Sequence, residues 1–144
     1  MKKEMYTMFK SIIVPVDLSH VDQLGKALDI AADLAKHYEA RVFYVGVTAT
    51  APGDVAHSPG EFANALKTFA NQQAEAHGIH TEAKALTTSD PTVEVDEKLI
   101  QAIEELNADL VVIGSHHPGV WQNVISHHGA YLATHADVSL FIVR

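Results

Sequence analysis

The sequence predicts an α/β fold: a single doubly wound domain with a five-stranded, mainly parallel sheet and helices on both faces. Five short runs rich in β-branched residues alternate with segments of helical periodicity. Strict alternation of strand and helix makes neighbouring strands parallel, because each crossover returns the chain to the same edge of the sheet. Most of the runs are apolar without polar alternation, as in strands covered on both faces. The length of 144 residues fits one domain.

The strands are predicted from runs such as Ser-Ile-Ile-Val-Pro-Val, which opens the domain. The third run alternates polar and apolar residues more than the others do. The predicted strands cover residues 11–16, 41–47, 80–86, 110–113 and 138–143.

Four helices are predicted between these strands, over residues 21–38, 60–77, 92–106 and 120–134. In the first of them, the apolar positions recur every three or four residues, so they share one face of a helix. Trp121, on the last helix, is expected to pack rather than to stack on a ligand. Residues 48–59 are small, polar and proline-bearing, which predicts a surface loop.

The composition limits the possible partners and chemistries. The chain has 18 acidic and 10 basic residues and a formal charge of −8, so DNA, RNA and anionic membranes are unfavourable partners. It has no cysteine, which excludes disulfides and thiolate metal sites. No apolar run approaches the roughly 18 residues that cross a bilayer. We therefore expect a cytoplasmic protein without nucleic-acid or membrane partners, with a leader at residues 1–9 and one domain at residues 10–144.

The predicted topology indicates where a ligand would bind. In open sheets of this kind, ligands lie beyond the carboxyl ends of the strands, where the strand order reverses. Three segments fall there: residues 15–19, Val47 with Thr48, and residues 114–119. The third carries two glycines before a predicted helix, so it is a candidate phosphate site. The alternative is an ordinary turn in which glycine only relieves backbone strain. Neither G-x-G-x-x-G nor G-x-x-x-x-G-K-[ST] occurs, which disfavours a dinucleotide site and a Walker-type NTPase.

Several of these segments together carry a resemblance to a known family. They are Val-Pro-Val-Asp-Leu-Ser at residues 14–19, the alanine-rich first helix, Asp-Leu-Val-Val-Ile-Gly-Ser-His at residues 109–116, and the final Val143-Arg144. In this combination the chain resembles the universal stress protein (UspA) family over about residues 10–144. The short loop after Gly114 is most similar to the filament-type subgroup. The resemblance implies a Rossmann-like, adenine nucleotide alpha-hydrolase-like domain.

For nucleotide-binding members, the resemblance implies a site for ATP or another adenine nucleotide, with or without Mg²⁺. Pro15, Val16 and Asp17 would contact the adenine or the ribose, and the main chain of Val47 would hold the base. The end of the fourth strand, the loop after it and the next helix would hold the ribose and the phosphates. The residues implied there are Ile113, Gly114, Ser115, His116, His117, Gly119, Ser126, His127 and His128.

The glycine pattern of the family is incomplete in this chain. Gly114 matches the first glycine, whereas His117 stands at the second, Ser126 at the third and His127 at the hydroxyl position that follows. A Cβ at such positions moves a phosphate away from the backbone N–H groups. Histidines 116, 117, 127 and 128 would compensate as donors, increasingly so as the pH falls toward a typical histidine pKa of about 6.5.

Two simpler or different interpretations of these residues stay open. Asp17 and Ser19 would also serve as the cap of a turn before the first helix, without any ligand. The four histidines named above leave a divalent metal site as an alternative, although no H-x₃-H or H-E-x-x-H pattern supports it.

Three functions of different classes follow from the sequence. The first is an adenine-nucleotide-binding stress-response or signalling dimer, and the second is a structural or adaptor dimer with a decayed pocket. The third, an enzyme of the related hydrolase architecture, lacks a Ser-Gly-Gly-x-Asp-Ser loop after the first strand. Ser115 and His116 have no third orienting group in the sequence, so we expect no dedicated enzyme, and slow ATP hydrolysis at most.

The resemblance also implies a homodimer through the last strand, which begins at Val138 and ends at Val143. A long apolar edge strand favours such pairing, because unpaired edges otherwise aggregate. The alternative is an edge covered by residues 1–9.

Overall fold

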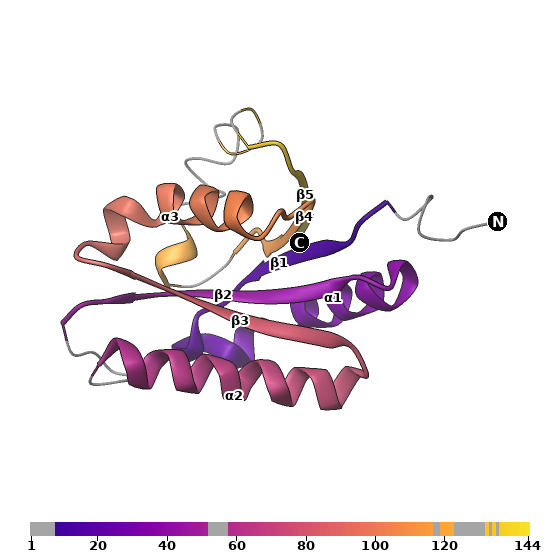
Figure 1. Cartoon of the computed structure of the whole chain (residues 1–144), viewed down its shortest axis with the longest axis horizontal. Coiled ribbons are helices and arrows are strands. Elements are labelled where there is room, and N and C mark those ends of the chain that lie inside the picture. The colour runs from indigo at the N-terminus through magenta and orange to yellow at the C-terminus, as the bar shows by residue number, and fades with distance from the viewer. Residues whose placement is uncertain (1–7, 52–57, 117–118, 123–131, 133, 135) are drawn as a thin grey trace.

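A single parallel sheet organises the molecule (Figure 1). The structure is a computed structural model, and it describes residues 8–51, 58–116, 119–122, 132, 134 and 136–144. The strand order is β3-β2-β1-β4-β5, and all of the pairings are parallel. The strands are β1 (Ser11–Pro15), β2 (Arg41–Ala49), β3 (His80–Thr88), β4 (Leu110–Gly114) and β5 (Ser139–Val143).

Helices cover both faces of this sheet. Figure 1 shows α1 (Gly25–Tyr38) and α2 (Pro59–His77) on one face and α3 (Pro91–Glu105) on the other. The chain therefore winds one way from β1 to β3 and then crosses to β4 and β5 on the other side of β1. The predicted doubly wound fold is confirmed.

The alternating side chains of the strands build two separate apolar layers. Ile12 and Val14 of β1 pack with α1 and α2, whereas Ile13 faces the layer formed with α3. All three are at most 1% exposed. Burial on both faces explains why β1 shows no polar alternation in the sequence.

The first helix begins later than its periodicity predicted, at Gly25 rather than at residue 21. Residues Leu18–Gln23 form 3₁₀ turns, with a non-helical kink at His20 (φ −134°, ψ 33°). The Leu24 N–H donates to the Val21 carbonyl, which closes a three-residue turn there instead of an α-helical one. Leu24 and Leu28 of the predicted apolar face are nevertheless buried.

Other boundaries shift by a few residues. Strands β2 and β3 run on to Ala49 and Thr88, because the two strands stay paired in register to their ends. Thr48 and Ala49 therefore belong to a strand and not to the predicted loop, whose middle lies outside the described residues. Most of the predicted fourth helix and most of the predicted leader also lie outside them.

Strand β2 and helix α2 approach each other closely. A Cβ on Gly46 would lie 2.8 Å from the Phe62 Cζ atom, so any other residue at position 46 would force the Phe62 ring to move. Within the parts of the chain that the structure describes, no helix is long and apolar enough to span a membrane.

Candidate functional site

The three predicted segments meet at the carboxyl edge of the sheet. Val16 follows β1, and its N–H donates to the Val45 carbonyl of β2 at 2.9 Å. Ser115 follows β4, and its N–H donates to the Val143 carbonyl of β5 at 2.8 Å. Because β1 lies between β2 and β4, the strand order reverses between β1 and β4, which is where sheets of this type bind their ligands.

Asp17 is held in place from several sides. Its Oδ1 accepts a hydrogen bond from the Ser19 N–H at 2.9 Å, so the predicted cap is formed. Its Oδ2 lies 3.2 Å from the His20 Nδ1, and the Asp17 side chain is 17% exposed. The cap accounts for one carboxylate oxygen, and the other faces His20, a neighbour that sequence reasoning did not assign to the site.

A short 3₁₀ turn, η3 (Gly119–Trp121), lies directly on the segment after β1. Gly119 has a φ of +73°, and a Cβ there would lie 1.7 Å from the Asp17 Oδ2. The Trp121 indole is 0% exposed, and its Nε1 donates to the Val16 carbonyl at 2.9 Å. As expected from the sequence, Trp121 packs in the core, in the layer that also holds Ile113.

Gly114 borders a cavity of about 230 Å³ at the ends of β4 and β5. His116 also lines it, together with Lys26 and neighbouring residues of α1 and with Arg144. The Lys26 ammonium donates to the Arg144 carbonyl at 2.7 Å. The cavity thus has basic side chains on its walls, although the whole protein is acidic. Lys26 is a further wall residue that the sequence did not indicate.

The backbone of Gly114 does not itself require glycine. Only Gly78 and Gly119 have positive φ angles among the described glycines. A Cβ on Gly114 would meet nothing within 4 Å. Relief of backbone strain therefore does not explain Gly114, whereas Gly119 does have a φ that favours glycine.

The remaining predicted site residues take different places. Pro15 is buried at the end of β1, and Ile113 is buried one residue before the end of β4. Val47 is half-buried in β2, and Ser115 Oγ lies 3.0 Å from the Nδ1 of the exposed His116. Four others lie outside the described residues: His117, Ser126, His127 and His128. Within the described ranges, no group of three or more histidine or acidic side chains is placed to hold a metal ion.

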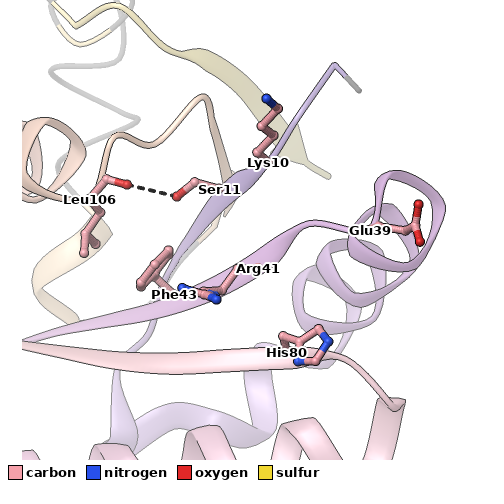
Figure 2. Close-up of a pocket in the computed structure, with 7 residues that line it drawn as sticks. All are labelled: Lys10, Ser11, Glu39, Arg41, Phe43, His80 and Leu106. Atoms are coloured by element: carbon pink, nitrogen blue, oxygen red, sulfur yellow. Dashed lines mark hydrogen bonds between the residues drawn. The ribbon is translucent and has the colours of Figure 1, made fainter. Parts of the chain in front are cut away.

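A second cavity, of about 330 Å³, lies at the opposite edge of the sheet (Figure 2). Its walls come from the starts of β1, β2 and β3, and Phe43 contributes an apolar surface. The guanidinium of Arg41, one of its wall residues, forms a salt bridge with the Glu82 carboxylate at 3.0 Å. Figure 2 shows the charged ends of Lys10, Glu39 and Arg41 pointing in different directions, so they do not converge on one ligand position.

Comparison with known proteins decides the family. The universal stress protein family matches residues 8–144. The chain belongs to the universal stress protein family. It is similar to universal stress protein G of Shigella flexneri, with 27% identity over 144 residues that cover 95% of this chain and 100% of that protein.

Solved universal stress proteins share the fold. A universal stress protein in complex with cAMP aligns with a TM-score of 0.65 and 19% identity, over 95% of this chain and 98% of the other. The Archaeoglobus fulgidus universal stress protein in complex with dAMP aligns with a TM-score of 0.64 and 20% identity, over 95% and 99% of the two chains. At these identities the likeness concerns the fold alone.

Proposed function

We propose that this universal stress protein binds an adenine nucleotide, such as ATP, at the carboxyl edge of its sheet and acts as a stress-response or signalling dimer. The observation that carries the proposal is Gly114, a glycine whose backbone angles do not require glycine, in the wall of a cavity that Lys26 and Arg144 also line. Solved members of the family hold cAMP and dAMP, which supports an adenine nucleotide as the ligand class.

The proposed roles follow the geometry of the edge. The segment from Pro15 to Asp17 and the Val47 main chain would contact the base and the ribose. The phosphates would lie against Gly114 and His116, where Lys26 and Arg144 supply positive charge. A Cβ on Gly114 would point into open space that a phosphate would fill.

Thermal-shift and calorimetric titrations with ATP, ADP and AMP test the proposal, with and without Mg²⁺ and at two pH values. We expect a stabilising shift for the wild type, larger at the lower pH, since anion binding to histidine strengthens on protonation. Gly114→Ala should fold like the wild type and bind about tenfold more weakly, a difference of about 1.4 kcal/mol.

Gly60→Ala is the matched control, because its Cβ would meet only the Ser58 Oγ at 3.8 Å. It should leave nucleotide affinity unchanged. The absence of any shift at millimolar nucleotide would contradict the proposed function.

A second candidate is a structural or adaptor dimer without a ligand. It is favoured by hydrogen bonds that the protein already makes at this edge. The Trp121 Nε1 donates to the Val16 carbonyl, and the Ser19 N–H donates to the Asp17 Oδ1. The same titrations separate the two functions, because the adaptor shows no response to any nucleotide.

The dimer would form through β5, as an edge-to-edge pair with a second copy. Phe141 and Ile142 of this strand are 41% and 43% exposed, which is unusual for such large apolar side chains on a sheet edge. We further propose a binding role rather than a dedicated catalytic one, to be checked by phosphate release from ATP over time.

A further inference from the structure

The indole of Trp121 lies beside the segment after β1, which the proposed function assigns to the ligand base. Strand order reverses between β1 and β4, and Val16 is the first residue beyond β1. The Trp121 Nε1 donates to the Val16 carbonyl at 2.9 Å, and the indole is 0% exposed. The ring therefore lies at the end of the strand beside the switch point, and not on the outer surface of a helix.

Indole and purine present similar chemistry to such a position. Both are flat, fused five- and six-membered rings, and both offer N–H donors at the ring edge. A main-chain carbonyl at the end of a buried strand needs a donor, because an unsatisfied buried carbonyl is unfavourable. Trp121 supplies the ring and the donor together.

A second contact places the turn Gly119–Trp121 against Asp17, the residue after Val16. Gly119 approaches Asp17 so closely that a Cβ would lie 1.7 Å from the carboxylate. The turn Gly119–Trp121 thus covers both Val16 and Asp17. A nucleotide cannot contact these two residues from the same side while the turn stays there.

We propose that the Trp121 indole occupies the purine-base subsite, so that indole and base exclude each other and a nucleotide binds only by displacing Trp121. This inference rests on the proposed function. The phosphate end at Gly114 stays accessible while Trp121 is in place, since its cavity is lined by other residues. The protein therefore distinguishes base-bearing ligands from simple polyphosphates by what happens to Trp121.

The single tryptophan of the chain makes the displacement observable. Binding of ATP, AMP and inorganic tripolyphosphate is measured by calorimetry, and tryptophan emission and acrylamide quenching are recorded on the same samples. We expect a red-shifted emission and at least twofold stronger quenching with ATP and AMP, because a fully buried indole becomes exposed. Tripolyphosphate should leave the emission unchanged.

Two variants test the competition directly. Trp121→Ala removes the competing ring and should bind ATP about tenfold more tightly than the wild type. Trp121→Phe keeps a ring without the N–H donor, so its ATP affinity should lie between those of the wild type and Trp121→Ala. Circular dichroism establishes that each variant is folded. If Trp121→Ala does not fold, the wild-type emission and Trp121→Phe decide the question.

The outcomes separate the inference from the proposed function. ATP binding to the wild type with unchanged tryptophan emission would overturn the inference and leave the proposed function intact. Binding to Trp121→Ala alone would show that the indole blocks the site, and it would overturn both the displacement of Trp121 and nucleotide binding by the wild type. Absence of binding in the wild type and in every folded variant would overturn both.

Discussion

Asp17 has close neighbours at both of its carboxylate oxygens. One of its oxygens receives the Ser19 N–H, and the other lies between His20 and the Cα of Gly119. A small change at Gly119 should therefore act through Asp17. Because Gly119 has a positive φ, any residue with a Cβ at this position should lower the free energy of unfolding by roughly 1–2 kcal/mol through backbone strain.

Gly119→Ala is expected to destabilise the protein more than Gly78→Ala does. Gly78 has a similar φ of +65°, but a Cβ there would meet nothing within 4 Å. Gly78→Ala therefore measures the cost of backbone strain without a clash. The clash with Asp17 should add about 1 kcal/mol through the lost hydrogen bond to Ser19. Urea unfolding of both variants measures the difference.

Asp17→Ala combined with Gly119→Ala provides the check on this interpretation. Removing the carboxylate should abolish the excess cost of Gly119→Ala, because the two residues are in contact. Equal destabilisation by Gly119→Ala and Gly78→Ala would contradict it.

At the residue scale, sequence reasoning found the candidate site only in part. Gly114 and Asp17 stand in local motifs next to apolar strands, so their placement at the sheet edge could be predicted. The hydrogen bond from Trp121 to Val16 spans 105 residues and leaves no local pattern. His20 was overlooked because it precedes the predicted helix, and its approach to Asp17 depends on 3₁₀ turns and a non-helical kink that left no pattern in the sequence.

At the level of elements, apolar runs and helical periodicity were sufficient to predict the order of the five strands and of the first three helices. The start of α1 moves from the predicted residue 21 to Gly25, because the chain first forms a 3₁₀ segment in which the Asp17 side chain competes for a backbone N–H. A second competition occurs between β3 and α3. There, the Glu94 carboxylate accepts hydrogen bonds from the Thr88 hydroxyl and the Asp90 N–H.

These contacts lower the pKa of Glu94, first through Thr88 and then through Asp90. A carboxyl group whose folded-state pKa is depressed stabilises the fold above its unfolded pKa, which is about 4.3, and the contribution is lost as the pH falls through the folded pKa. Glu94→Gln should therefore lower the Tm at pH 7, and the difference from the wild type should shrink below about pH 4.

Glu97→Gln is the control for this pH series, since Glu97 is exposed on the same helix. It should follow the wild type at every pH. A Glu94→Gln deficit that stays constant down to low pH would show that the pKa of Glu94 is not coupled to folding.

At the scale of the whole molecule, the exposed apolar pair on β5 bears on assembly. If β5 pairs with a second copy, the wild type should scatter light as a particle of about twice the 15.6 kDa chain mass. Its Tm should also rise with protein concentration, because association stabilises the folded state. Ile142→Lys places a charge in that interface and should give a monomer.

Val93→Lys is the matched control for Ile142→Lys. Val93 is 71% exposed on α3, away from β5, so a lysine there should leave the mass unchanged. A wild-type protein that stays monomeric at high concentration would refute the dimer.

The position of β1 in the sheet also has a consequence for how the chain is made. Of the five strands of this sheet, the first to be synthesised is the middle one, flanked by β2 on one side and by β4 on the other. The backbone groups on one edge of β1 therefore stay unpaired until residues 110–114 have been synthesised. During that interval the nascent chain exposes an apolar strand edge to other chains, which is the state that chaperones recognise and that aggregates when synthesis outpaces folding.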